Sequence, residues 1–473
     1  MSLALSLLAY ATAAVLLAFS LRRAVLLITA CLPRPPDPPT TGLPDILILI
    51  PCRNEAASLP GLFDSLDRLD YPREQMRVVI VDDGSTDDTG AAAGGLIAAR
   101  PWAQLISLPT NVGKAQALNE VLSSGPYPSP AGAPFANPST ALRSAQDANR
   151  GGDSLPPSGT SLTGEGSGMG AEIAVIYDAD HRPAPDSLRA LVAPFVADPL
   201  QRTEPNVAAV SGQMRVANGA ASPAAFYAMI ESHVHQLITM QAKDRLDLAP
   251  AILGSNCAYR LSALQAVGGF RRGVLLEDSD LTLAFALTGW RTRFAPASIS
   301  EHHAPVTVRG YAKQHLRWNR GFHQVAGGRL ASLWTNSQVR TRHPAPLRSG
   351  DYRAASLPLK LELTFFALGY ADRLALLAGA LFTVIDLMRP GTFGFPLWIW
   401  LIYFGLPALE MLAALVLARE PPGIFLRLVY VPFFFALDIG IALWSNMETL
   451  TRKPFAWSAT ERQSNLATDK ERM

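Results

Sequence analysis

The sequence contains little cysteine and almost no net charge. Its three cysteines, Cys31, Cys52 and Cys257, are far apart and match no zinc-binding or disulfide pattern. The 41 basic and 39 acidic residues leave a net charge of only +2, and a surface that binds nucleic acid would need a much larger excess. The chain has 473 residues, which is too long for one ordinary domain and long enough for a catalytic domain plus a membrane region.

Charge is absent from the first apolar segment. Leu3–Leu21 carries no charged residue and has the length of a helix that crosses a bilayer. Arg22 and Arg23 follow directly, and by the positive-inside rule they place the N-terminus outside and the rest of the chain in the cytosol. The alternative is a lipoprotein signal processed at Cys31, but the charged region that opens a signal peptide is missing. We predict a transmembrane helix over 1–32 in the plasma (inner) membrane, then a linker over 33–44.

Three further apolar segments lie near the other end, and two of them look like full spans. The first contains Asp372-Arg373, which is costly in lipid. Either Leu357–Tyr370 lies at the membrane surface before a short span, or the ion pair faces the interior of a helix bundle. We expect an interfacial segment over 331–360, membrane helices over 361–446 and a tail over 447–473, on a side of the membrane that stays open. The apolar segments are Leu361–Met388, Leu397–Ala418 and Ile424–Trp444.

Between these ends, short apolar runs alternate with helical patterns, as in a mostly parallel α/β sheet. Polar clusters follow several strands, and the carboxyl ends of strands are where ligands bind in open α/β sheets. Ser124–Gly170 is rich in Ser, Pro and Gly, and we expect a disordered insertion within a catalytic domain over 45–330. The predicted strands are Asp45–Ile50, Arg77–Val81, Gln104–Ser107, Ile173–Tyr177 and Val207–Ser211.

Two aspartates follow the fourth predicted strand. Asp178 and Asp180 are two residues apart, so their side chains point to the same side. Paired carboxylates suit a hard divalent ion that is also held by substrate phosphates. A nucleotide-diphosphate sugar needs such an ion, because its leaving diphosphate gains negative charge. Asp is also common in turns for backbone reasons alone, but a second acidic strand end upstream favours the metal site.

Two other acidic pairs have both a structural and a functional interpretation. Asp82 and Asp83 precede residues that can cap a helix beginning near Asp88, while Asp83 could also bind a nucleobase or ribose. Glu277 and Asp278 open a helix and can stabilise its N-terminus. The functional alternative makes Asp278 a general base that takes a proton from an acceptor hydroxyl.

Gln314 and Arg317 lie three residues apart and share one helix face, beside Trp318. Arg binds diphosphate through two parallel hydrogen bonds, and Trp can present a flat apolar face to a sugar. The structural interpretation is an interfacial helix with Arg317 and Trp318 at the level of the lipid headgroups.

Taken in order, these segments resemble glycosyltransferase family 2, in particular its membrane-integrated polysaccharide synthase branch. The resemblance runs from about Asp45 to Arg320. Beyond it, the tail Trp457–Arg462 is similar to the W-x-x-T-x-R ending of bacterial poly-N-acetylglucosamine synthases. Leu276 and His315 depart from the residues most common in this branch. The matching motifs are Ile50–Glu55, Val81–Asp87, the N-x-G-K-x-x-A-L-N helix start Asn111–Asn119, the D-x-D at Asp178–Asp180, the E-D at Glu277-Asp278, and the Q-x-x-R-W at Gln314–Trp318.

The resemblance implies an α/β GT-A (Rossmann-like) catalytic domain with transmembrane and interfacial helices at both ends. It also implies a UDP-sugar donor, Mg²⁺ or Mn²⁺, and inversion at the anomeric carbon. The implied roles are as follows: Pro51, Glu55, Asp82, Asp83, Lys114 and Asp178 bind the donor; Asp178 and Asp180 hold the metal; Asp278, with Glu277, is catalytic; Gln314, Arg317 and Trp318 grip the diphosphate and the acceptor.

Three hypotheses follow for the function. The first is a processive synthase that elongates a β-glycan such as poly-N-acetylglucosamine, with an export partner protein as a candidate partner. The second is a glycolipid synthase that adds one sugar to a lipid. The third is a catalytically silent assembly component. The joint presence of five residues argues against it: Asp83, Asp178, Asp180, Asp278 and Arg317. The expected partners are a nucleotide sugar, a glycan or lipid acceptor and membrane lipid, with no nucleic acid.

Overall fold

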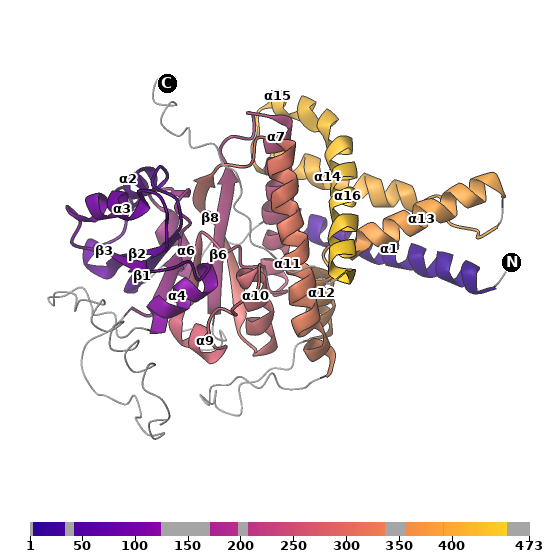
Figure 1. The fold of residues 1–473 in the computed structure, drawn as a ribbon. Coiled ribbons are helices and arrows are strands. Elements are labelled where there is room, and N and C mark those ends of the chain that lie inside the picture. The colour runs from indigo at the N-terminus through magenta and orange to yellow at the C-terminus, as the bar shows by residue number, and fades with distance from the viewer. Residues whose placement is uncertain are drawn as a thin grey trace.

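The computed structural model describes residues 3–33, 42–123, 171–196, 207–335, 356–390 and 392–451. The predicted insertion over 124–170 lies outside these residues, as do most of the 33–44 linker and most of the 447–473 tail. The described residues form an eight-stranded sheet in the order β3-β2-β1-β4-β7-β6-β8-β5, with apolar helices from both ends of the chain packed beside it (Figure 1).

The first four strands of this order are parallel and match four of the predicted strands closely. Side chains of β1 alternate between the two faces, so Ile46, Ile48 and Ile50 enter one apolar core while Leu47 and Leu49 enter the other. Both cores are covered by helices, which is why the run is apolar throughout. The strands are β1 (Ile46–Cys52), β2 (Met76–Asp83), β3 (Ala103–Leu108) and β4 (Ile173–Ile176).

The second half of the sheet makes it mixed rather than mostly parallel. β7 (Cys257–Arg260) runs antiparallel to both β4 and β6 (Val207–Val216). β8 (Arg291–His302) is parallel to β6. The short β5 (Arg182–Pro183) pairs with β8 in the antiparallel direction. The apolar pattern of a strand carries no information about its direction, so the sequence could not reveal this reversal.

Helices cover the two faces of the sheet. One face is covered by α2, α3 and α6, whose apolar residues join the core with Ile48. The other face is covered by α4, α9 and α10, which join the core with Leu47. The bounds are α2 (Leu59–Asp67), η1 (Arg73–Gln75), α3 (Thr89–Ile97), α4 (Lys114–Ser123), α6 (Ser187–Val196), α7 (Pro223–His233), η2 (Val234–Met240), α8 (Gln241–Arg245), α9 (Leu261–Ala266), α10 (Glu277–Leu287) and α11 (Val308–Thr335).

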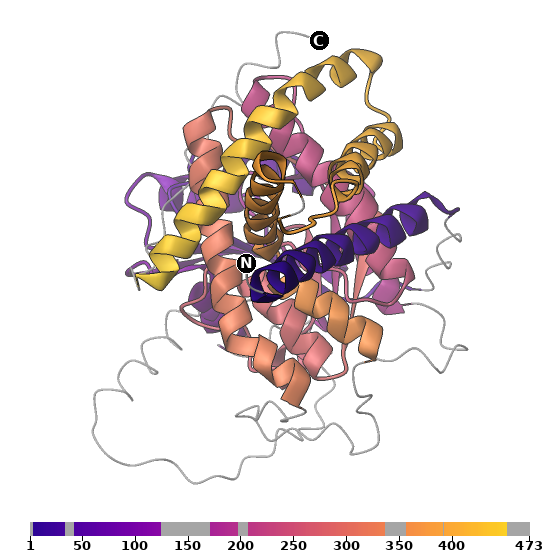
Figure 2. The ribbon, with the colours of Figure 1, turned by 90° about the vertical axis from the view of Figure 1, so that its right-hand side faces the viewer.

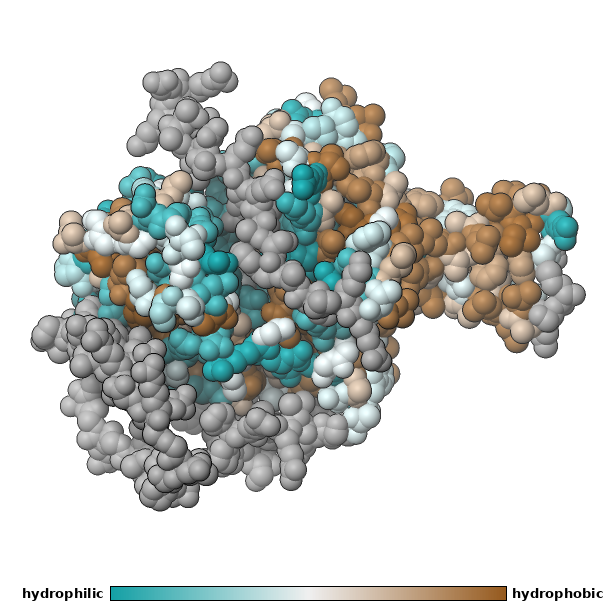
Figure 3. All heavy atoms as spheres, in the orientation of Figure 1, coloured by the Kyte–Doolittle hydropathy of each residue, from teal (hydrophilic) through white to brown (hydrophobic). Residues whose placement is uncertain are grey.

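Helices from the two ends of the chain pack on each other. α1 (Leu3–Cys31) lies against α13 (Ala371–Met388) and α14 (Ile399–Leu417), and these helices project from one side of the α/β unit (Figures 1 and 2). Their projecting surface is strongly apolar (Figure 3). α12 (Leu357–Ala367) packs on α11, as does α16 (Val431–Leu450), which follows α15 (Pro422–Phe425) and η3 (Leu426–Tyr430).

Within the described ranges, three stretches are long and apolar enough to cross a membrane: Ala4–Cys31, Ile399–Leu417 and Pro422–Leu450. Two of the three predicted C-terminal segments therefore meet this criterion, as expected. The remaining segment is divided into α12 and α13. Asp372 and Arg373 lie in the first turn of α13 and form an ion pair of 2.6 Å, with the Asp372 side chain only 2% exposed. The buried ion pair agrees with the second alternative of the sequence analysis. α12 is a separate helix before it, and the placement of α12 at the membrane surface stays a prediction.

Candidate active site

A single cavity of about 1590 Å³ collects almost all the site residues predicted from the sequence. It begins at the carboxyl ends of β1, β2 and β4 and continues toward α1, α14 and α16. Segments that are more than two hundred residues apart in the sequence therefore share one space. Of the predicted site residues, the cavity is lined by Pro51, Glu55, Asp83, Lys114, Asp178, Asp180, Glu277, Asp278, Gln314, Arg317 and Trp318, whereas Asp82 does not line it.

Asp83 holds the turn that starts α4. Its two carboxylate oxygens accept hydrogen bonds from the backbone N–H groups of Val112 and Gly113, at 2.7 and 2.9 Å. Gly113 has φ +86°, a conformation that favours glycine, and this turn directs Lys114 into the cavity. Asp82 instead accepts from the N–H of Ser85 at 3.1 Å, within its own loop. Asp82 thus supports the loop, while Asp83 lies at the cavity wall.

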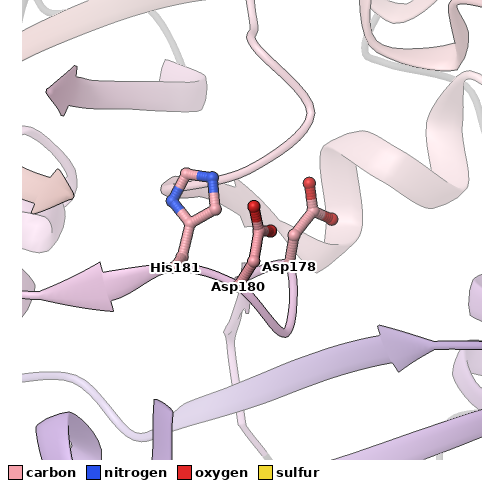
Figure 4. A group of neighbouring side chains, drawn as sticks. All are labelled: Asp178, Asp180 and His181. Atoms are coloured by element: carbon pink, nitrogen blue, oxygen red, sulfur yellow. The ribbon is translucent and has the colours of Figure 1, made fainter. Parts of the chain in front are cut away.

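Asp178 and Asp180 leave β4 on a tight turn, and His181 follows them (Figure 4). One ligand atom from each of the three side chains lies within 4.8 Å of the others. Two carboxylate oxygens and an imidazole nitrogen are a donor set that accepts Mn²⁺, and the carboxylates alone suit Mg²⁺. The residues therefore fit the expected divalent ion. His181 was missed by the sequence analysis, although its position directly after the D-x-D pair was a usable signal.

Lys114 connects Asp178 with the E-D motif. Its Nζ donates to Asp178 Oδ1 and to the backbone carbonyl of Gly254, each at 2.8 Å, and lies 3.8 Å from Glu277 Oε1. Burial acts to lower the pKa of Lys114, but the carboxylates of Asp178 and Glu277 raise it overall. The ammonium therefore remains charged. The Gly254 carbonyl is a contact that no side-chain motif could have predicted.

Asp278 lies at the start of α10, at the cavity wall. Burial raises its pKa to about 7, with the neighbouring Glu277 carboxylate as the second cause. Gly254 approaches it closely, since a Cβ on Gly254 would lie 2.9 Å from Asp278 Oδ2. A carboxylate with a pKa near neutrality can both accept and release a proton, which is the property a general base needs.

The helix α11 brings the Q-x-x-R-W residues to the opposite wall. Gln314, Arg317 and Trp318 all line the cavity. Gly321, one turn later, lets the helix pack tightly, because a Cβ there would lie 2.4 Å from Leu276. This contact places α11 directly against the residue before Glu277-Asp278, and it explains why the position of Leu276 tolerates a bulky apolar side chain.

If Asp278 is the general base that the sequence predicts, turnover should rise with pH through its pKa. A general base works only when deprotonated, and the pKa of this carboxyl is raised to about 7. We expect kcat/KM to increase tenfold per pH unit below about pH 6.5 and to level off above about pH 8. The measurement is initial rates across this range at saturating metal. A profile without an acidic limb would assign the base to another group.

Two family models match the chain. The model described as "Glycosyl transferase family 2" matches residues 47–124, and the model described as "Glycosyl transferase family group 2" matches residues 173–420. Together they cover both sides of the 124–170 segment. They include the β2, D-x-D, E-D and Q-x-x-R-W residues that line the cavity.

Several curated proteins are similar in sequence. A probable glycosyltransferase of Bacillus subtilis, YdaM, is 25% identical over 62% of this chain and 58% of its own length. A poly-beta-1,6-N-acetyl-D-glucosamine synthase of Staphylococcus epidermidis is 23% identical over 63% of this chain and 58% of its own. A beta-monoglucosyldiacylglycerol synthase of Synechocystis is 24% identical over 61% and 50%. The match thus spans half to three fifths of these relatives' length.

One solved structure is similar over nearly the whole chain. The mannosyltransferase PcManGT from Pyrobaculum calidifontis, solved with GDP-Man and Mn²⁺, superimposes with a TM-score of 0.58 at 22% identity. The alignment covers 95% of this chain and 99% of that one. This likeness and the sheet topology confirm the GT-A-like mixed α/β fold, with helices at both ends that could span a membrane.

Proposed function

Because the chain belongs to glycosyl transferase family group 2 and is a glycosyltransferase, we propose that it transfers one sugar from a UDP-sugar to an uncharged membrane lipid. The observation that carries this proposal is the cavity, which joins the acidic strand ends to Asp278 and then continues among apolar helices. The proposal therefore selects the glycolipid alternative of the sequence analysis over the processive synthase.

The donor end would bind the nucleotide and its diphosphate. Asp178 and Asp180, with His181, would hold Mg²⁺ or Mn²⁺, which neutralises charge on the leaving diphosphate. Lys114 lies beside Asp178 and supplies a second fixed positive charge. Arg317, on the opposite wall, can bind diphosphate oxygens through its planar guanidinium. These groups stabilise the charge that develops as the bond between sugar and phosphate breaks.

Asp278 would take the acceptor's proton. The acceptor O–H donates to the Asp278 carboxylate while its oxygen attacks the anomeric carbon from the face opposite the diphosphate. The new glycosidic bond forms, the bond to the diphosphate breaks with its electron pair, and the proton moves to Asp278. One displacement inverts the anomeric carbon, in agreement with the expectation from the sequence. Lys114, 3.8 Å from Glu277 and bonded to Asp178, holds the two acidic groups in fixed relation.

The far end of the cavity suits a lipid. Its walls there are apolar side chains from α1, α14 and α16, contributed by Phe19, Phe404, Pro407, Met411 and Phe435. An acyl chain in this space would remove apolar surface from water, at roughly 0.8 kcal/mol per buried CH₂ group. The hydroxyl of such a lipid would then point toward Asp278, at the polar end of the same cavity.

Three arginines that line the cavity, Arg22, Arg23 and Arg373, are already paired. Arg22 contacts both carboxylate oxygens of Glu362, at 2.7 and 2.6 Å, and Arg23 contacts Glu410 at 2.5 Å. Arg373 is bound by both oxygens of Asp372, at 2.6 and 2.7 Å. A lipid phosphate would have to displace these carboxylates, whereas a neutral glycerolipid hydroxyl would not. This charge balance favours an uncharged lipid.

The packing of the membrane helices argues against a channel for a growing glycan. Among the described residues, the space between α1, α13 and α14 is filled by a core that includes Leu16, Phe382 and Ile399. The rings of Phe382 and Phe393 lie 5.0 Å apart in this core. A sugar chain leaving through this bundle would need these side chains to separate. Transfer of one sugar to a lipid that stays in the bilayer needs no such opening.

The test uses the full chain extracted in detergent with Mg²⁺ or Mn²⁺. A panel of UDP-sugars, with GDP-mannose included because PcManGT was solved with it, is screened for nucleotide release. Each donor is paired with diacylglycerol or with a polyprenyl phosphate, and the product is sized by mass spectrometry. We expect one UDP-sugar to react with diacylglycerol, to give a product larger by one sugar, and to stop reacting when chelator is added.

Each other outcome would contradict a definite part of the proposal. A long glycan product would restore the processive synthase. Faster transfer to polyprenyl phosphate would overturn the uncharged acceptor, and faster transfer from GDP-mannose would overturn the UDP-sugar. Folded protein without turnover on any pair would favour the silent assembly component.

A further inference from the structure

A second cluster of side chains that could bind a metal lies on three helices outside the sheet. Glu231 comes from α7, His315 from α11 and Asp438 from α16, and these helices pack side by side (Figure 1). One ligand atom of each residue lies within 4.8 Å of the others. His315 and Asp438 are buried, at 4% and 5% exposure. His315 is the second residue of the Q-x-x-R-W segment, where the sequence analysis noted a departure from the residue most common in the branch.

The two carboxylates of this cluster have too few hydrogen-bond donors around them. The Tyr311 hydroxyl lies 3.0 Å from Glu231 Oε2 and 2.8 Å from Asp438 Oδ1, but it has a single hydrogen to donate. The Tyr227 hydroxyl donates to the other oxygen of Asp438 at 3.3 Å. The buried carboxylate of Asp438 and the partly exposed carboxylate of Glu231 therefore face each other across one tyrosine, and two like charges this close are costly without a cation.

Protein cations do not supply the missing charge. Arg373 acts electrostatically on both Glu231 and Asp438, yet its own Nη1 donates to both carboxylate oxygens of Asp372. Its charge is therefore largely cancelled. Among the described residues, no salt bridge joins a Lys or Arg side chain to Glu231 or Asp438.

The histidine points into the space between the carboxylates. His315 Nε2 is buried and has no hydrogen-bond partner. It lies 3.4 Å from Glu231 Oε2, while Nδ1 of the same ring lies 3.8 Å from Asp438 Oδ1. A buried nitrogen without a partner costs free energy comparable to a lost hydrogen bond. A bound cation would satisfy this nitrogen and both carboxylates at once.

We propose that Glu231, His315 and Asp438 bind a divalent transition-metal cation, with Zn²⁺ or Mn²⁺ as the candidates, at a site separate from Asp178 and Asp180. One neutral imidazole and two carboxylates are a common ligand set for such ions. The ion's two positive charges equal the two negative charges of the ligands, so the buried site becomes neutral. Access exists, because the Glu231 side chain is 30% exposed and lines the large cavity.

The ion would hold α16 to the catalytic domain. Because its ligands come from α7, α11 and α16, binding would connect an apolar C-terminal helix with the helix that carries Gln314, Arg317 and Trp318. Metal binding that exists only in the folded state stabilises that state by mass action. The proposal is independent of the sugar, the acceptor and the reaction, because it concerns metal content alone.

The test is the zinc content of full-length protein in detergent. The Asp178→Asn, Asp180→Asn double variant removes the donor-metal carboxylates and serves as the background. After chelation, reloading with Zn²⁺ alone and desalting, we expect this background to retain one zinc per chain and to melt at a higher temperature than its chelated form. Adding His315→Ala or the nearly isosteric Glu231→Gln to this double variant should lower its zinc content to that of the chelated protein. His323→Ala, on the same helix but outside the cluster, is the matched control and should retain it.

Three results would overturn the proposal. The first is a double variant that holds no zinc and does not melt higher with it, in which case the two carboxylates share a proton instead. The second is bound zinc that survives both His315→Ala and Glu231→Gln. The third is zinc that His323→Ala removes as completely as His315→Ala does. Glu231→Gln keeps the test decisive if His315→Ala fails to fold.

Discussion

Replacing Asp278 with Asn is expected to lower kcat by roughly 10²- to 10⁴-fold while leaving the melting temperature unchanged or higher. The loss follows because Asn cannot accept the acceptor's proton. The stability should not fall, because burial and Glu277 raise the pKa of Asp278 to about 7. Above that pH the folded protein holds an unfavourable charge that the unfolded chain does not penalise, and Asn removes it. Asn can still accept the 2.6 Å hydrogen bond from the N–H of Ser279.

The measurement is single-turnover transfer at about pH 8, with thermal melting of the same preparation. If Asp278→Asn retained more than about a tenth of the wild-type rate, Asp278 would not be the base. If rate and melting temperature fell together, Asp278 would be a structural residue.

Replacing Asp280 with Asn is expected to do the opposite: a large loss of stability with the chemistry retained. Asp280 is fully buried, and its two oxygens contact Arg329 at 2.8 and 2.5 Å and Arg271 at 2.9 Å. Removing one partner of a buried ion pair costs about 3–5 kcal/mol, because the other charges stay buried without compensation. For a protein of this size the melting temperature should fall on the order of 5–10 °C.

A matched variant makes this result specific. Asp247→Asn removes a carboxylate that lies 2.8 Å from Arg291, but its side chain is 60% exposed. Exposed pairs contribute between about 0 and 1 kcal/mol, so its melting temperature should barely change. We expect kcat per folded molecule to stay within about tenfold of wild type in Asp280→Asn. Equal shifts in melting temperature for the two variants would contradict a special role for the buried network.

Much of the sheet and the composition of the site were readable from the sequence. The run Ile46–Ile50 is apolar without interruption, so it had to be a strand covered on both faces. Asp83 and Asp178 follow predicted strands, and parallel strands end at one edge, so their meeting in one cavity could be expected. The residue types therefore specify the elements and the edge at which the polar groups collect. The role of each residue in binding or catalysis stays a prediction.

Other parts of the site depend on contacts between distant segments. The Gly254 carbonyl beside Lys114 is a backbone group, and backbone groups carry no sequence signal. The antiparallel direction of β7 places that loop near Asp278, and strand direction does not change an apolar pattern. Likewise, the apolar length of α16 indicates a membrane helix, but not that α16 packs along α11.

Asp278 and Asp280 show that the neighbouring sequence does not determine the environment of a carboxylate. Both are aspartates in the first turn of α10, and their sequence surroundings are nearly the same. Asp278 faces the cavity beside Glu277, and burial with that like charge raises its pKa. Asp280 is enclosed by Arg271, from the loop before α10, and by Arg329, from α11. Residue type and spacing along the chain thus set which elements form and where acidic groups gather. The charge that each acidic group carries depends on its burial and on which charged side chains face it, and both are decided only when the chain has folded.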